Sequence, residues 1–114
     1  MLQPEAAVQA LSALAQAHRL SVFRLLVRAG SEGLPAGVVA RELDVAPSTL
    51  SSHLAILGHA GLVRSRREGR SVIYAADYAG MRALLGFLVA DCCQGREEIC
   101  APLAGLAQAC CTPP

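Results

Sequence analysis

Residues 47–75 read PSTLSSHLAILGHAGLVRSRREGRSVIYA, and the expected fold follows mainly from these residues. In the first part, leucines recur at i, i+4 and i+7, which is the spacing of one face of an amphipathic helix: Leu50, Leu54 and Leu57. The second part changes to two short runs, 62–67 and 70–75, on either side of Glu68-Gly69, a pair typical of a tight hairpin turn. The segment therefore predicts a helix followed by a small two-stranded β-hairpin.

Apolar residues recur at helical spacing on both sides of this segment. The pattern predicts helices over the following ranges: about 6–17, 18–28, 35–43, 47–58 and 78–92. Pro35 and Pro47 suit the first turn of their helices, and Asp77 suits the N-cap of the last one. A short helix, a turn, a second helix and a basic hairpin follow one another in the order of a winged helix-turn-helix. The expected fold class is therefore mainly α with a small β-hairpin.

Composition limits the kind of protein. The chain has 114 residues, of which 54% are hydrophobic, enough for one compact core. No run approaches the ~20 apolar residues that span a bilayer, and the N-terminus lacks a basic signal-type region, so we expect a soluble cytoplasmic protein without membrane contact. The net charge is only +1, but four arginines gather around Glu68: Arg64, Arg66, Arg67 and Arg70. Such a cluster can form an anion-binding edge on a nearly neutral protein.

Small polar side chains lie opposite the leucines of the 47–58 helix. Small hydroxyls let a helix approach the floor of a DNA major groove, and the helix N-terminus adds partial positive charge. The best placed hydroxyls lie near the helix start: Ser48, Thr49, Ser51 and Ser52. They could instead serve as caps. His53 lies at the boundary of the two faces, either as a half-buried histidine or as a phosphate ligand, whereas His18 and His59 are expected to be ordinary surface or boundary residues.

Several segments together resemble the ArsR/SmtB family of metal-responsive repressors: AHRL at 17–20, FRLL at 23–26, SSHLAIL at 51–57, AGLV at 60–63 and REGR at 67–70. The resemblance covers about residues 6–93. It implies a homodimeric winged-helix repressor that binds double-stranded operator DNA at an imperfect inverted repeat and leaves when its inducer binds. The DNA-binding residues that it implies lie in the recognition helix and the wing: Ser48, Thr49, Ser51, Ser52, His53, Arg66, Arg67 and Arg70.

The last helix supports a homodimer independently of the resemblance. Its apolar residues cover an arc of roughly 200°, about twice what one face against a core needs: Met81, Leu84, Leu85, Phe87, Leu88 and Val89. A second copy would cover the excess, with the apolar first helix beside it, and would place two recognition helices about 34 Å apart. The alternative is a monomer that buries both sides of this helix within itself.

Three cysteines lie where the last helix is expected to end: Cys92, Cys93 and Cys100. Gly95 allows the chain to reverse so that Cys100 returns toward the pair. Three thiolates neutralise a trivalent ion, so we expect As(III), with Sb(III) as an alternative, to be the inducer. Zinc prefers four ligands, often including histidine, and no histidine follows His59. The cysteines could also be small buried residues, and the role of Cys110 and Cys111 stays open.

Two other kinds of sensor remain open within the same fold. One is a thiol redox switch, and the other is a repressor that senses the divalent ions Cd, Pb or Zn. A thiol enzyme such as an arsenate reductase is disfavoured, because Cys92 and Cys93 end an apolar helix beside acidic residues instead of lying in an anion-binding loop. We therefore expect no enzyme and no organic cofactor. Residues 1–93 would form the DNA-binding and dimerisation domain, and 94–114 would complete the inducer site.

Overall fold

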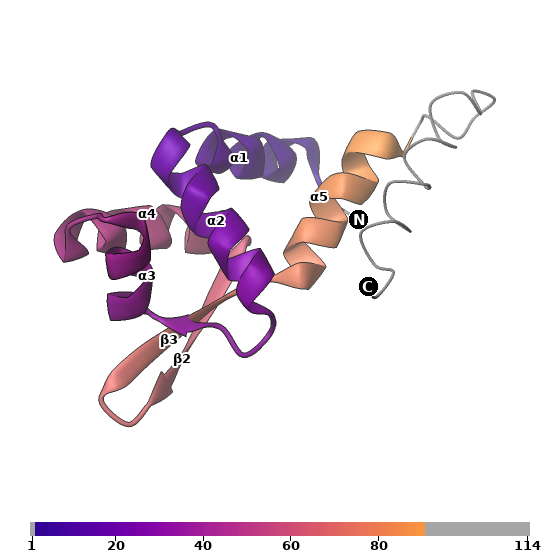
Figure 1. Ribbon diagram of the computed structural model, residues 1–114. Helices are drawn as coiled ribbons and strands as arrows, with labels where there is room; N and C mark the ends of the chain where they lie inside the picture. Colours follow the sequence, from indigo (N-terminus) through magenta and orange to yellow (C-terminus); the bar gives the residue numbers. More distant parts are fainter. Residues whose placement is uncertain (1, 91–114) are drawn as a thin grey trace, which may run out of the picture.

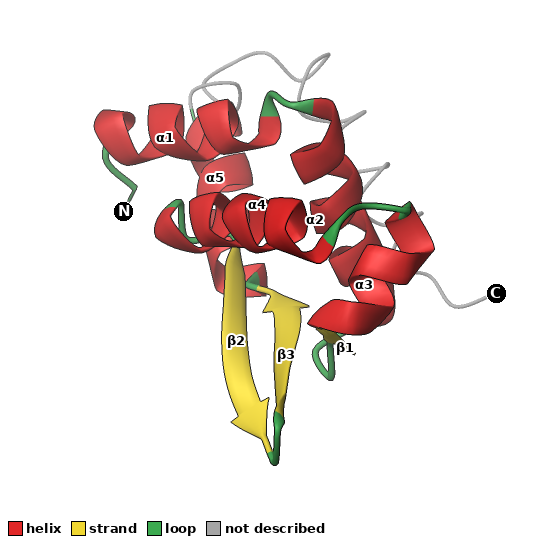
Figure 2. Cartoon of the chain, turned by 90° about the vertical axis from the view of Figure 1, so that its left-hand side faces the viewer, coloured by secondary structure: helices red, strands yellow, loops and turns green. Residues whose placement is uncertain are grey.

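The computed structural model describes residues 2–90 and shows a mainly helical fold with a small antiparallel sheet (Figure 1). Its elements follow in the order α1 (Pro4–Leu14), α2 (Ala17–Ala29), β1 (Leu34–Pro35), α3 (Ala36–Leu43), α4 (Pro47–His59), β2 (Val63–Glu68), β3 (Ser71–Ala76) and α5 (Tyr78–Val89). Helices α3 and α4 form the helix-turn-helix, and the β2–β3 hairpin extends from it as the wing (Figure 2). The winged helix-turn-helix predicted from the sequence is confirmed.

The wing sheet differs from the expected hairpin in two details. A third strand, β1, joins the sheet in the order β1-β3-β2, with Leu34 opposite Tyr74. A strand of two residues is too short for an alternation pattern to reveal it. The hairpin turn also lies one residue later than predicted, because Glu68 pairs with Ser71 and only Gly69 and Arg70 remain between the strands. Gly69 takes the left-handed conformation that such a tight turn requires, at φ +62°.

The leucine stripe of α4 lies at the centre of the core. Leu50, Leu54 and Leu57 are at most 2% exposed. They pack in one cluster with side chains from the other elements, among them Val22, Leu26, Val39 and Leu62. Burying each leucine contributes about 1.5–3 kcal/mol to stability. This packing holds the opposite, polar face of α4 at the surface.

Helix α1 buries a different face from its large apolar residues. Its buried side chains are Ala7, Ala10 and Ala13, whose small size lets the helix lie close to the core. Val8 is 65% exposed and Leu11 is 41% exposed. The helices predicted over 6–17 and 18–28 are both present, but α1 ends at Leu14, three residues earlier than predicted, and α2 begins at Ala17. Val8 and Leu11 thus lie outside the core, whereas Leu14 at the end of α1 packs against it.

Helix α5 begins as predicted and leaves most of its apolar residues exposed. The Oδ1 atom of Asp77 accepts a hydrogen bond from the backbone N–H of Gly80 at 3.1 Å, which caps the helix. Within α5 only Leu84 is buried, whereas Leu85 is 52% exposed and Leu88 is 51% exposed. The predicted end near Cys92 lies outside the described residues. No helix in residues 2–90 is both long and apolar enough to cross a membrane.

Candidate nucleic-acid interface

The start of α4 presents free hydroxyl groups at the surface. Pro47 occupies the first turn, and the N-cap residue Ala46 makes no side-chain capping hydrogen bond. The hydroxyls are therefore not used as N-caps, and all four side chains are exposed: Ser48, Thr49, Ser51 and Ser52. The Oγ atom of Ser52 donates to the carbonyl of Ser48 at 3.5 Å, which is the outer limit of a hydrogen bond. The helix start thus combines exposed donors with the positive end of the helix dipole.

His53 lies deeper than its four neighbours. Its ring stacks on that of His18 in α2, with the ring centroids 5.7 Å apart and the planes 23° from parallel. Its Nδ1 atom is buried and has no hydrogen-bond partner among the described residues. Burial, then the charges of Arg19 and His18, hold the pKa of His53 below its usual value. The buried Nδ1 atom and the lowered pKa both disfavour the charged ring, which favours a packing role over that of a cationic phosphate ligand.

The His18–His53 contact is a feature of this surface that the sequence does not predict. His18 was expected to be an ordinary surface or boundary residue, and it is indeed exposed on one side. The partners are 35 positions apart in the chain, so no local spacing indicates the contact. Only the packing of α2 against α4 brings them together.

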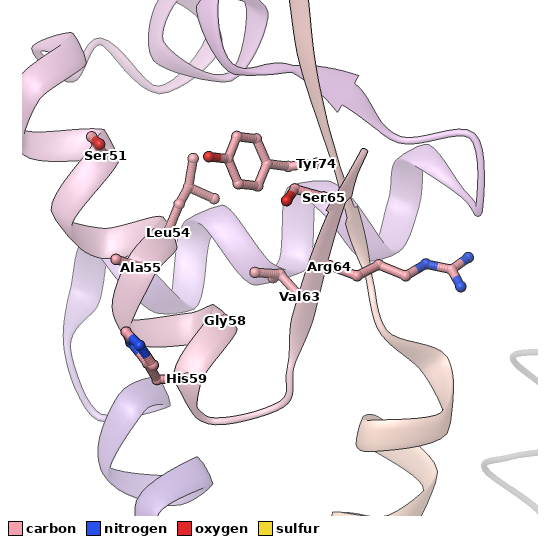
Figure 3. A pocket seen from close by; sticks show the side chains of 9 residues that line it. All are labelled: Ser51, Leu54, Ala55, Gly58, His59, Val63, Arg64, Ser65 and Tyr74. Carbon is pink, nitrogen blue, oxygen red and sulfur yellow. The ribbon is translucent and has the colours of Figure 1, made fainter. Parts of the chain in front are cut away.

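The wing arginines point in different directions. Side chains alternate along a strand, so Arg64 and Arg66 lie on one face of β2, and Ser65 and Arg67 lie on the other. Figure 3 shows Ser65 directed toward α4 and Arg64 directed away from it. Arg67 therefore shares the α4 side of the wing, and Arg70 lies in the turn at its tip. All four arginines are exposed.

Arg66 is already engaged within the protein. Its Nε atom donates to Oε2 of Glu68 at 2.7 Å, and its Nη2 atom donates to the carbonyl oxygen of Glu32 at 2.8 Å. These bonds tie the wing to the loop before β1. Of the three predicted wing contacts, Arg67 and Arg70 are thus more available to DNA than Arg66.

An open groove of about 400 Å³ separates α4 from the wing (Figure 3). Leu54 and Val63 line it together with polar groups that include Ser51, Ser65 and Tyr74. Ser51 lies on α4 at one wall, and Ser65 and Tyr74 lie on the strands at the other, with the phenol directed toward α4 (Figure 3). The groove has hydrogen-bond donors on both walls and lies next to the arginines of β2. It can therefore accommodate the sugar–phosphate backbone of DNA when α4 lies in the major groove.

All five cysteines, including the three of the predicted inducer site, belong to the last 23 residues of the sequence. Cys92, Cys93 and Cys100 lie outside the described residues, as do Cys110 and Cys111. Within residues 2–90, no three histidine, cysteine or acidic side chains are close enough to share a metal ion.

Comparison with known proteins identifies the family. Residues 14–66 match a family described as a helix-turn-helix domain. The transcriptional activator HlyU of Vibrio cholerae is 32% identical over 91 residues, which are 80% of this chain and 82% of HlyU. The structure of reduced HlyU from the same organism has a TM-score of 0.61 at 31% identity, covering 78% of this chain and 90% of HlyU.

Two further structures share the fold over most of the chain. The homodimeric winged helix-turn-helix DNA-binding domain of Mb0332 from Mycobacterium bovis has a TM-score of 0.63 at 28% identity, covering 77% of this chain and 81% of that one. An ArsR-like transcriptional regulator from Rhodococcus sp. RHA1 has a TM-score of 0.67 at 25% identity and covers 92% of both chains. With its exposed recognition helix, its basic wing and these relatives, the chain belongs to the ArsR family of DNA-binding winged helix-turn-helix transcriptional regulators.

Proposed function

We propose that the protein is a homodimeric repressor that binds an imperfect inverted repeat in operator DNA and is released by trivalent arsenic or antimony. The observation that carries the DNA-binding part is the row of exposed hydroxyls at the start of α4, which do not serve as N-caps and lie beside the arginines of the wing. Four small donors can bond to base edges or phosphates without steric exclusion: Ser48, Thr49, Ser51 and Ser52. Arg67 and Arg70 would contact the flanking backbone.

The exposed apolar side chains of α1 and α5 support a dimer. Val8 and Leu11 on α1 and Leu85 and Leu88 on α5 are each at least 41% exposed. The two helices contact each other, and a hollow of about 310 Å³ between Leu2 and the α5 residues is almost wholly apolar. Contiguous exposed apolar surface is typical of a site where a partner binds. The similar domain of Mb0332 is a homodimer, which is consistent with a second copy as the partner.

The three-cysteine sensor is argued from the sequence. Cys92 and Cys93 come three and four positions after Val89, the last residue of α5, and Cys100 is seven positions after Cys93. Three thiolates match the charge and the three-coordinate preference of As(III) and Sb(III). The divalent ions Cd, Pb and Zn would leave a net negative charge beside Asp91. The cysteines therefore favour a trivalent thiophilic inducer.

The start of α5 offers a route from the sensor to the DNA. The backbone N–H of Asp77 donates to the carbonyl oxygen of Leu62 at 2.8 Å, directly after α4. Gly80 lies against the carbonyl of Gly61, where a Cβ atom would clash. A displacement of α5 would therefore displace the turn at the end of α4. A coupling of about 1–3 kcal/mol would weaken DNA binding about 5- to 150-fold, and operator DNA would weaken inducer binding by the same factor.

A thiol redox switch is the second candidate. It rests on the same cysteines and on the similarity to HlyU, for which a reduced form is described. HlyU is a transcriptional activator, so the direction of regulation is itself part of the proposal. Oxidation of a cysteine pair would replace ion binding as the signal.

Fluorescence anisotropy with DNA from the promoter of the protein's own operon tests these alternatives. The full chain is titrated with arsenite, antimonite, cadmium, lead and zinc under anaerobic reducing conditions, and separately with the thiol oxidant diamide. We expect release by arsenite or antimonite under reduction, and no release from a variant in which Cys92, Cys93 and Cys100 are serine. Release by arsenite from that variant would overturn the proposed site. Release by diamide alone would favour the redox switch.

A further inference from the structure

A second hollow lies on the other flank of α4, away from the wing. It has a volume of about 360 Å³ and lies between α1, the start of α2 and the last turns of α4. Its lining combines polar groups with one exposed apolar side chain: Gln9, Ser12, Ala13, Arg19, Ile56 and His59. Liquid water takes ~30 Å³ per molecule, so the hollow has room for a phosphate group and several waters.

Arg19 is held at this hollow and keeps most of its donors free. Its Nε atom donates to the carbonyl oxygen of Ala13 at 2.6 Å, and its backbone N–H donates to Oε1 of Gln16 at 2.9 Å. The guanidinium makes no other hydrogen bond within the described residues, which leaves four of its five N–H donors available. The single ion pair in residues 2–90 joins Arg66 and Glu68, so no described carboxylate neutralises Arg19.

The surroundings of Arg19 favour an anion. Ser12 and Gln9 offer a hydroxyl and an amide on one wall, and His59 offers a ring nitrogen on the other. Glu5 lies one helical turn before Gln9 on α1 but does not line the hollow. The lining of the hollow thus combines the Arg19 guanidinium with three polar side chains that can donate hydrogen bonds.

We propose that this hollow binds a phosphate group, and that the phosphate belongs to the DNA strand on the side of α4 opposite the wing. Figure 2 shows α1 and the wing on opposite sides of α4. A helix in the major groove lies between two phosphate backbones. The wing side would contact one backbone through Arg67, and Arg19 would contact the other. This inference rests on the proposed DNA binding through α4.

The salt dependence of DNA binding tests the inference. Ser12→Glu places a carboxylate in the hollow and leaves the Arg19–Ala13 hydrogen bond in place, and Ser12→Gln is the neutral control of nearly equal size. We expect Ser12→Glu to weaken operator binding about 10-fold or more relative to Ser12→Gln, and to reduce the slope of log affinity against log salt by about 1. Equal affinities and slopes in the two variants would overturn the proposal.

Arg19 itself is tested by Arg19→Gln, with Arg28→Gln as the matched control. Arg28 is exposed in the last turn of the same helix, about 13 Å away along its axis. Only Arg19→Gln is expected to reduce the salt slope. Since Arg19 also contacts the end of α1, circular dichroism checks that the variant is folded. If Arg19→Gln does not fold, the Ser12 pair decides.

The phosphate bound in the hollow could also come from free phosphate in solution instead of from DNA. Inorganic phosphate is titrated against the wild type without DNA, at ionic strength matched with chloride, and the thermal midpoint is followed. A saturable rise that Ser12→Glu abolishes, together with equal DNA affinities and salt slopes of the two Ser12 variants, would assign the hollow to a soluble phosphate and overturn the DNA part. If wild type binds no promoter DNA, the proposed function fails. If the wild type binds promoter DNA but Ser12→Glu and Ser12→Gln have the same affinity and salt slope, only the phosphate site in the hollow is overturned.

Discussion

At the scale of single residues, two arginines of the same strand are expected to differ in function. Arg64 and Arg67 are both exposed and carry the same charge, but the strand places them on opposite faces of the wing. Only Arg67 shares the face of Ser65, which points toward α4 (Figure 3). The two arginines contribute equally to the net charge, but only Arg67 lies on the face of the wing that is directed toward α4.

This difference gives the first prediction. Arg67→Gln should weaken operator binding about 10-fold and lower the salt slope by about 1, because one phosphate contact is lost. Arg64→Gln should change both much less. The measurement is anisotropy at several salt concentrations. Equal losses in the two variants would show that the wing contacts DNA with both faces.

His53 predicts how stability depends on pH. Its pKa is lowered in the folded protein, so the unfolded chain binds the proton more readily than the folded one. The stability is then fully present above the unfolded value of ~6.5 and is lost as pH falls through the lowered folded value. His53→Phe keeps an aromatic ring against His18 and removes this titration.

We expect the urea midpoint of the wild type to fall between about pH 7 and pH 5, and that of His53→Phe to fall less. His59→Gln is the control, because it removes an exposed histidine of the same helix. Parallel profiles for the wild type and His53→Phe would contradict the assignment. A flatter profile in His59→Gln would transfer the effect to that residue.

At the scale of elements, the contact between α5 and the turn after α4 depends on two glycines without side chains. Gly80 has its Cα beside the carbonyl group of Gly61, and Gly61 has a positive φ of +78°. The close approach lets the N–H of Asp77 reach the carbonyl of Leu62. No helical periodicity indicates such a contact, because a glycine contributes nothing to an apolar pattern.

Gly80→Ala should therefore destabilise the fold by about 1–3 kcal/mol, since the new methyl group meets backbone that cannot rotate away. Gly37→Ala in α3 is the control, because its Cβ would come no closer than 3.9 Å to the Arg41 side chain. In this control the free energy of unfolding should rise by about 0.5–1 kcal/mol, because alanine favours a helix more than glycine does. Chemical denaturation measures both. A neutral Gly80→Ala would mean that α5 is free to shift, and the proposed route to α4 would be lost.

At the scale of the whole molecule, the exposed apolar residues of α1 and α5 set the expected assembly. Leu88→Glu should convert a dimer to a monomer, because a charge would have to be buried in the interface. Leu20→Glu in α2 is the control, since Leu20 is 44% exposed and lies outside the two helices. Sedimentation equilibrium gives the mass, and anisotropy should show that the monomer no longer binds the inverted repeat. A dimeric Leu88→Glu, or a monomeric wild type, would contradict the proposed interface.

The amino-acid sequence by itself determined the helices, the hairpin and the fold class, because these depend on local spacing. The leucines of α4, the proline at its start and the Asp77 cap each act within a few residues. The hydroxyl row could be proposed in the same way, since its members share one helical turn. The exact position of the hairpin turn could not be predicted, because it depends on the pairing register of β2 and β3. The strand β1 could not be predicted either, because two residues are too few to show an alternation pattern.

What only the tertiary structure decided are the relations between segments far apart in the chain. His18 in α2 stacks on His53 in α4, and Arg66 in β2 donates a hydrogen bond to the carbonyl oxygen of Glu32 before β1. The hollow around Arg19 is lined by residues of α1, α2 and α4. A charged or aromatic side chain has the same local pattern whether it faces solvent or another helix, so spacing cannot distinguish these cases. Packing of the core places each element, and that placement separates the arginines available to DNA from the one already bound within the protein.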